Sequence, residues 1–198
     1  MATYVLADLH VHSALSPCAA DDMTPPAILL SAERRGVAIV AVVDHGTARN
    51  ARAILEAAPA FRVKPLVGLE VESAEGVHLL ALFDTAEAAL EMDSVVAGHL
   101  PEAENRPEIL GRQLLLNEWG EVIAEDKRLL VAATDLGIEK VADLAIRCGG
   151  LCIPAHIDRS ANGLLHVLGF VPPNLYADAF ELSRQITLQE ALCRWPSL

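Results

Sequence analysis

The chain alternates apolar runs with amphipathic stretches, which predicts strands and helices in turn. Residues 37–43 form a continuous apolar run, the pattern of a strand buried on both faces of a parallel sheet, and residues 4–7 read as the apolar body of a first strand. The other predicted strands are residues 64–71, 77–83, 151–156 and 179–182. This alternation favours βα units around a mainly parallel sheet or barrel.

Capping residues and periodicity predict the helices between these strands. Thr24, followed by two prolines, predicts an N-cap and a helix that ends at Gly36. Thr47 is expected to cap a second helix over residues 48–58. Asp84 or Thr85 is expected to open a helix that ends at about Ala97, and further helices are predicted over residues 138–147 and 188–194.

The whole chain, residues 1–198, is expected to form a single domain with one less regular insertion. Residues 99–134 are interrupted by Pro101, Pro107, Gly111 and Gly120, and they predict an inserted helical or helix-hairpin segment on the rim. With 53% hydrophobic residues the chain can bury a full core. No linker or repeat divides it.

Composition bears on the partners that the protein could take. The net charge is −12 and aromatic residues make up 4%, so no long nucleic acid is expected as a partner. An acidic protein can still handle phosphates if bound cations supply positive charge.

The expected location is the cytoplasm. The four cysteines form no C-x-x-C pair, so reduced thiols are expected. The N-terminus has no secretory signal pattern, and the longest apolar runs fall far below the roughly 18 residues of a membrane span. No membrane partner is expected.

Candidate metal ligands follow the predicted strands. In Asp8-Leu9-His10-Val11-His12 the side chains at i and i+2 leave one face of a strand, so Asp8, His10 and His12 are expected to point one way. The histidines and carboxylate at the ends of other strands are His45, Glu70 and His156. In a barrel those ends converge on one mouth.

The chemistry of this donor set points to divalent metals. Neutral imidazoles with a carboxylate suit Zn, Mn or Fe, and a glutamate can bridge two ions through its two oxygens. Two adjacent ions can activate a water and neutralise charge on a phosphoryl group. The hypothesis is therefore phosphoester hydrolysis through a metal-bound hydroxide.

The same residues resemble the successive motifs of the PHP (polymerase and histidinol phosphatase) family, in the family's order. The motifs are Asp8-Leu9-His10-Val11-His12-Ser13, Val43-Asp44-His45, Gly68-Leu69-Glu70, Val77-His78-Leu79 and Pro154-Ala155-His156-Ile157-Asp158-Arg159. The resemblance implies an α/β fold, a distorted (β/α)7 TIM-like barrel, here incomplete at the C-terminus. It also implies phosphoesterase activity with two or three divalent metal ions, Mn, Zn or Fe.

The resemblance also implies roles for single residues. His10 and His12 would hold the first ion with Glu70, which bridges to a second ion held by His78 and His156. His45 would serve a third ion.

Two further residues are expected at the catalytic centre. Asp44 would orient a ligand, and Arg159 would clamp a phosphate because its planar fork matches phosphate oxygens. The expected substrate is a small phosphorylated metabolite or a nucleotide.

Two departures from the family pattern remain. The family's aspartate after His-x-His-Ser is missing, since Ser16 is followed by Pro17, and Cys18, Asp21 or Asp22 could replace it. The family's final Asp-x-His motif has no counterpart before Leu198. A truncated domain, a fragment and a site completed by another subunit stay open.

Other assignments also stay open. His99 could replace His78 as a ligand, although its setting reads as a loop. Arg159 could instead pair with Asp158 or Glu181. A non-catalytic metal-binding or structural module is the alternative function. An amidohydrolase-type barrel enzyme would also use His-x-His, but no Lys lies at a matching strand end. The oligomeric state stays open.

Overall fold

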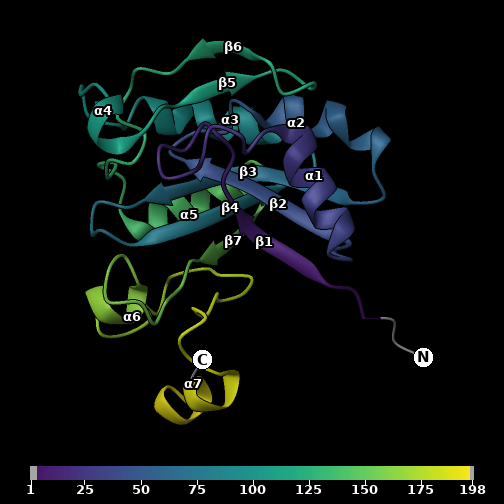
Figure 1. The fold of residues 1–198 in the computed structure, drawn as a ribbon. Coiled ribbons are helices and arrows are strands. Elements are labelled where there is room, and N and C mark those ends of the chain that lie inside the picture. The colour runs from purple at the N-terminus through teal and green to yellow at the C-terminus, as the bar shows by residue number, and fades with distance from the viewer. Residues whose placement is uncertain (1–3, 197–198) are drawn as a thin grey trace.

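The structure is a computed structural model that describes residues 4–196. Its centre is a curled five-stranded sheet in the order β1-β2-β3-β4-β7, with helices along one side (Figure 1). The strands are β1 (Ala7–Val11), β2 (Ile39–His45), β3 (Lys64–Glu72), β4 (His78–Phe83) and β7 (Leu151–Pro154). The sheet is a half-barrel, as the family resemblance predicts for an incomplete barrel.

The helices and a separate hairpin complete the described chain. The helices are α1 (Pro25–Arg34), α2 (Ala51–Ala57), a 3-10 turn (Ala58–Ala60), α3 (Ala86–Ala97), α4 (Pro107–Leu110), α5 (Ile138–Arg147), α6 (Leu164–Val167) and α7 (Leu188–Arg194). The hairpin strands are β5 (Leu114–Leu116) and β6 (Val122–Glu125). Within residues 4–196, no helix is both long and apolar enough for a membrane crossing.

Strand direction places five chain segments at one end of the sheet. β1, β2 and β3 are parallel, whereas β4 is antiparallel to both β3 and β7. The start of β4 therefore lies beside the ends of β3 and β7. His78, the first residue of β4, reaches the same mouth as the histidines that follow the parallel strands.

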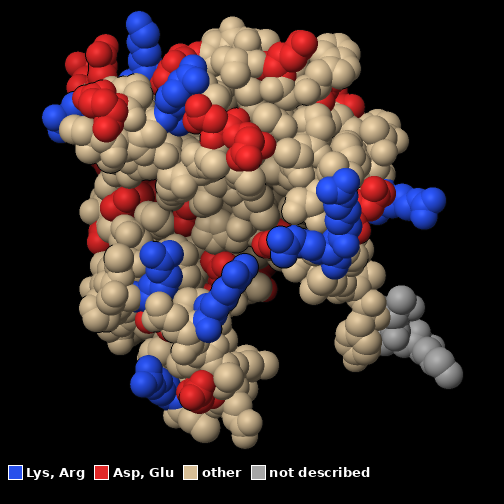
Figure 2. Space-filling view, viewed as in Figure 1, with Lys and Arg blue, Asp and Glu red and all other residues tan. Residues whose placement is uncertain are grey.

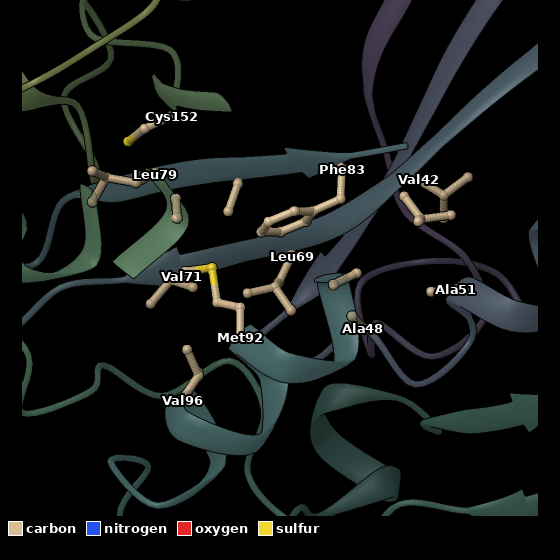
Figure 3. Packing of buried hydrophobic residues seen from close by; sticks show 14 of the residues in the cluster. Val42, Ala48, Ala51, Leu69, Val71, Leu79, Phe83, Met92, Val96 and Cys152 are labelled. Atoms are coloured by element: carbon tan, nitrogen blue, oxygen red, sulfur yellow. The ribbon is translucent and has the colours of Figure 1, made fainter. Parts of the chain in front are cut away.

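The period of two along each strand divides the core into two faces. Residues such as Leu69, Met92 and Phe83 fill the main core between the sheet and the helices (Figure 3). The concave face carries a smaller apolar cluster that includes Val43 and Leu80. His45 lies two positions after Val43 and His78 lies two positions before Leu80, so both face the concave side.

β1 reaches this arrangement through a bulge. Its register against β2 shifts between Asp8 and Val11, and Leu9 packs against the concave cluster. Asp8 is therefore out of register with His10 and His12 along the strand, although all three residues line one groove. The Asp8 carboxylate accepts a hydrogen bond of 3.4 Å from the His10 backbone N–H.

Helix caps follow the sequence in two places and differ in a third. Thr24 and Thr85 cap α1 and α3 through their side chains, as predicted for Thr24. Thr47 does not cap α2, because its hydroxyl donates to Asp93 Oδ1 at 2.6 Å. The helix begins at Ala51, after Asn50. A long-range contact has overridden the local capping signal.

The insertion and the last predicted strand also differ from expectation. Residues 99–134 hold the β5–β6 hairpin and only the four-residue helix α4, so the helical interpretation of this segment is wrong. The hairpin lies beyond α2 and α3, away from the sheet (Figure 1). Residues 179–182 form no assigned strand, although Glu181 N–H donates to Pro154 O at 3.1 Å, beside β7.

Candidate metal centre

Glu70 is the centre of a cluster of five histidines on the concave side of the sheet. Its side chain is 2% exposed, and imidazole nitrogens surround both carboxylate oxygens. Around Oε2 lie His10 Nε2 at 3.3 Å, His12 Nε2 at 3.3 Å and His45 Nδ1 at 3.1 Å. Around Oε1 lie His78 Nδ1 at 2.7 Å and His156 Nε2 at 3.4 Å.

The two oxygens of Glu70 thus face two different sets of imidazoles. A carboxylate in this position can join two cations, one on each oxygen, which is the bridging role expected from the sequence. Two compact groups of ligand atoms, each within 4.8 Å of one another, contain Glu70. One adds His10 and His12, and the other adds His45 and His78.

His156 carries two signs of a site built for a ligand. Its backbone has a φ of 31°, an uncommon conformation for a residue with a side chain, and such outliers concentrate at functional sites. Its Nδ1 atom is buried and has no hydrogen-bond partner within the described residues. A buried imidazole nitrogen without a partner is costly. The other ring nitrogen, Nε2, lies 3.4 Å from Glu70 Oε1 and is the atom placed to bind a cation there. The residues therefore fit a divalent metal.

Proton affinities in the cluster reflect the competition between burial and the carboxylates. When no cation is bound, burial lowers the pKa of His10, but hydrogen bonds to Glu181 and Glu70 outweigh it and raise the pKa to about 10. At His78, burial also lowers the pKa, but hydrogen bonds to Glu70 and Glu72 outweigh it and raise the pKa to about 9. Burial dominates at His45 and lowers its pKa to about 4.

The carboxylate shows the matching effect. Burial alone would raise the pKa of Glu70, but hydrogen bonds from the imidazoles outweigh it and hold the pKa well below its usual range. Glu70 is therefore ionised at neutral pH. The raised pKa values of His10 and His78 mean that both imidazoles carry a proton beside it at neutral pH.

Metal binding is expected to release protons from His10 and His78. A histidine must be neutral to bind a metal, and both imidazoles hold their protons up to pH values of about 9–10. The apparent affinity for Zn or Mn should therefore rise with pH across the neutral range. Calorimetric titration in two buffers of different ionisation enthalpy should show release of at least about two protons per chain, one from each of these histidines. Equal heats in the two buffers would contradict this.

Asp44 holds the loop after β1 rather than facing the imidazoles directly. It is 3% exposed and accepts hydrogen bonds from Ser13 N–H at 2.8 Å, Ser13 Oγ at 2.6 Å and Ser16 Oγ at 2.7 Å. Burial raises the pKa of Asp44, while His12 and the two serines oppose that rise. From this position Asp44 contacts the imidazoles only through Ser16, and the orienting role expected for it stays a prediction.

Ser16 links Asp44 to the imidazole cluster, because its hydroxyl donates to Asp44 and contacts His12 and His45. Its Oγ accepts from His45 N–H at 3.0 Å and lies 3.1 Å from His12 Nδ1. The contact leaves His12 Nε2 directed at Glu70. Neither Ser13 nor Ser16 was singled out as a site residue from the sequence.

Glu181 is a third residue that sequence reasoning did not assign to the site. Its Oε2 lies 2.9 Å from His10 Nδ1 and accepts from His156 N–H at 3.0 Å. A hydrogen bond to one ring nitrogen fixes the orientation of an imidazole and leaves the other nitrogen free for a metal. The available signal was a glutamate inside a predicted strand at residues 179–182, the same pattern as Glu70.

Replacing this carboxylate should weaken metal binding. Glu181→Gln removes the charge that orients His10, and loss of such an outer partner costs about 10–100-fold in metal affinity. Asp178→Asn is the matched control, because Asp178 ties the same segment to Cys152 N–H without touching an imidazole. Competition titration with a chromogenic chelator measures both. Equal affinity in Glu181→Gln and wild type would refute the role.

Cys18 belongs to a third group of possible ligands. Its Sγ and one ring nitrogen each of His12 and His45 lie within 4.8 Å of one another. The other two candidates for the missing aspartate lie outside the ligand groups found in the described chain. Asp21 is exposed and pairs with Arg112 at 3.4 Å, and Asp22 is exposed.

Arg159 lies at the edge of a groove that opens onto the cluster. The groove has a volume of about 470 Å³ and is lined by His10, His12, His156, Arg159, Arg184 and neighbouring residues. Both arginines are exposed, and Arg159 forms no ion pair with another residue of the described chain, including Asp158 and Glu181. Figure 2 shows basic side chains bordering the hollow between the C-terminal segment and the body of the molecule.

The remaining candidate ligand lies elsewhere. His99 Nδ1 lies 2.6 Å from Asp135 Oδ1 at an exposed position, so it does not take the place of His78. The structure thus brings together His10, His12, His45, Glu70, His78 and His156, places Arg159 at the rim and Asp44 one contact away.

Comparison with known proteins gives a family match. The PHP domain matches residues 8–158, which include every residue of the cluster. No curated protein matches the chain.

Solved structures show the same fold. The lesion-specific endonuclease PfuEndoQ from Pyrococcus furiosus aligns with a TM-score of 0.68 and 22% identity over 92% of this chain and 43% of its own. A proposed metal-dependent phosphoesterase from Bifidobacterium adolescentis aligns with a TM-score of 0.61 and 14% identity, over 97% of this chain and 84% of its own. An amidohydrolase from Chromobacterium violaceum aligns with a TM-score of 0.50 and 19% identity, over 77% of this chain and 67% of its own. The chain spans less than half the length of the endonuclease.

Proposed function

The chain belongs to the PHP domain family, and on this basis we propose that it is a metal-dependent phosphoesterase. The observation that carries the proposal is the placement of Glu70 between two sets of imidazoles, three at Oε2 and two at Oε1. This donor set suits two or three ions of Zn, Mn or Fe. Such ions lower the pKa of bound water towards neutrality and offset the charge of a phosphoryl group.

The protein's own residues would position the ions and the substrate. His10 and His12 with Glu70 would hold one ion, His78 and His156 would hold the second on the other oxygen, and His45 would serve the third. Glu181 and Ser16 would fix the imidazole orientations through their hydrogen bonds to His10 and His12.

The groove supports a phosphorylated substrate. Its volume of about 470 Å³ falls within the usual 300–1,000 Å³ of small-molecule sites, so a nucleotide or a phosphorylated metabolite would fit. Arg159 stands at the rim with its guanidinium free to bind two phosphate oxygens. With a net charge of −12, the protein would attract phosphate mainly through the ions and these rim arginines.

Nucleic acid is a second candidate substrate. One of the similar structures is described as endonuclease Q in complex with a duplex that carries an abasic lesion, at a TM-score of 0.66 and 22% identity. The open groove with Arg159 and Arg184 would also accept a strand end. The net charge and the low aromatic content argue against long nucleic acid as a substrate. The likeness to this structure is the reason to keep it as a candidate.

Turnover measurements on both substrate classes test the proposal. Purified protein supplied with Mn or Zn should release phosphate or nucleotide from a panel of phosphorylated metabolites, nucleotides and lesion-bearing oligonucleotides. His10→Ala should abolish turnover, whereas His166→Ala, in the peripheral helix α6, should leave it unchanged. Metal bound at full occupancy without turnover on any substrate would favour the non-catalytic module instead.

A further inference from the structure

The loop between β1 and α1 brings a thiol to the edge of the imidazole cluster. Cys18 is exposed, and its Sγ completes a group with ring nitrogens of His12 and His45, all within 4.8 Å of one another. The rings of His12 and His45 stack with centroids 4.6 Å apart. Among the described cysteines, Cys148, Cys152 and Cys193 belong to no such group.

One serine holds all three members of this group in place. Ser16 Oγ contacts His12 Nδ1 and accepts from His45 N–H, and the buried Asp44 fixes that hydroxyl. The Ser16 carbonyl accepts from Ala19 N–H at 2.9 Å, which closes the turn that carries Cys18. Ser16 therefore orients the two imidazoles through its side chain and the turn that carries Cys18 through its backbone.

We propose that His12, Cys18 and His45 bind one divalent ion, with Cys18 as a thiolate ligand, and that this ion is zinc rather than manganese. Two imidazoles and a thiolate form a soft donor set, which zinc accepts readily and which manganese, favouring carboxylates and water, does not. On binding, the thiol gives up its proton to solvent and a sulfur–metal bond forms.

This inference rests on the proposed function, because His12 and His45 also belong to the centre around Glu70. Because only Nε2 of His12 faces the cluster, His12 can serve one ion at a time. When it binds the ion at Cys18, the ion proposed for His10, His12 and Glu70 would be held by His10 and Glu70. The thiolate is the donor that distinguishes the ion at Cys18 from the ions held by Glu70.

Cobalt spectroscopy on the full chain reports the sulfur–metal bond directly. Titration with Co²⁺ should produce a thiolate-to-cobalt charge-transfer band in wild type and in Cys193→Ser, which removes another exposed thiol away from the cluster. Cys18→Ser should lose the band and keep the cobalt held by imidazoles. Loss of an outer partner alone costs about 10–100-fold in affinity, so loss of this direct donor should weaken zinc binding at least tenfold.

Two further measurements separate a ligand from a bystander. Zinc should protect Cys18, and not Cys193, from alkylation as followed by mass spectrometry. Cys18→Asp should retain the number of bound ions, lose the charge-transfer band and shift preference towards manganese.

Failure of the Cys18 proposal can be distinguished from failure of the proposed function. Full cobalt binding without a charge-transfer band, and equal zinc affinity in Cys18→Ser, would overturn the role of Cys18 and leave the proposed function standing. Failure of the wild-type chain to bind cobalt or zinc at all would overturn both.

Discussion

Glu70→Gln should abolish metal binding at the centre and reduce phosphoesterase turnover by roughly a thousandfold or more, because bound metals supply several kcal/mol of transition-state stabilisation at about 1.4 kcal/mol per tenfold. The amide keeps the shape of the side chain but loses the charge that faces five imidazoles. Elemental analysis and turnover measure the two effects.

The same substitution should reverse the raised pKa values of its neighbours. Hydrogen bonds to Glu70 help raise the pKa of His10 and His78, so both values should fall in Glu70→Gln, as followed by NMR titration without metal. Glu91→Gln makes the same chemical change on the exposed side of α3 and should alter neither metal content nor turnover. Full metal content in Glu70→Gln would rule out the bridging role.

Asp44→Ala should lower the free energy of unfolding by about 3 kcal/mol or more, since each buried donor left without an acceptor costs about 1–3 kcal/mol. Three donors would lose their partner: Ser13 N–H, Ser13 Oγ and Ser16 Oγ. For a chain of this size the expected fall in melting temperature is roughly 6–12 °C. Metal affinity should fall as well, because Ser16 would no longer hold His12 and His45.

Two variants frame this prediction. Asp44→Asn keeps an acceptor oxygen for Ser13 and Ser16, and should be less destabilising than Asp44→Ala. Asp84→Ala removes an exposed carboxylate just after β4 and should change the free energy of unfolding by about 0.5 kcal/mol or less. Chemical denaturation measures all three. An Asp44→Ala protein as stable as Asp84→Ala would contradict the account of the loop.

The centre was the most predictable part of the molecule. The sequence places His45 at the end of one strand and Glu70 near the end of the next, and parallel strands bring their ends to one edge. His78 joins them only because β4 runs antiparallel, which the period-two pattern of residues 77–83 cannot reveal. The family resemblance supplied that ligand.

The contacts that support the centre were less predictable, because they join residues far apart in the chain. Glu181 reaches His10 across 171 positions, and Asp44 reaches Ser13 across 31. Thr47 carries a capping signal that its bond to Asp93 overrides. In the insertion, the apolar residues Val122 and Ile123 are both exposed on β6. The apolar pattern there therefore does not show which face of the strand is buried.

The most direct test of the central claim is the metal content per chain, measured by elemental analysis of protein purified without chelator or affinity-tag histidines. The arrangement of five imidazoles around Glu70 predicts two or three equivalents of Zn, Mn or Fe in the purified or reconstituted protein. A content near zero that persists after reconstitution would contradict the metal centre and the phosphoesterase activity proposed from it.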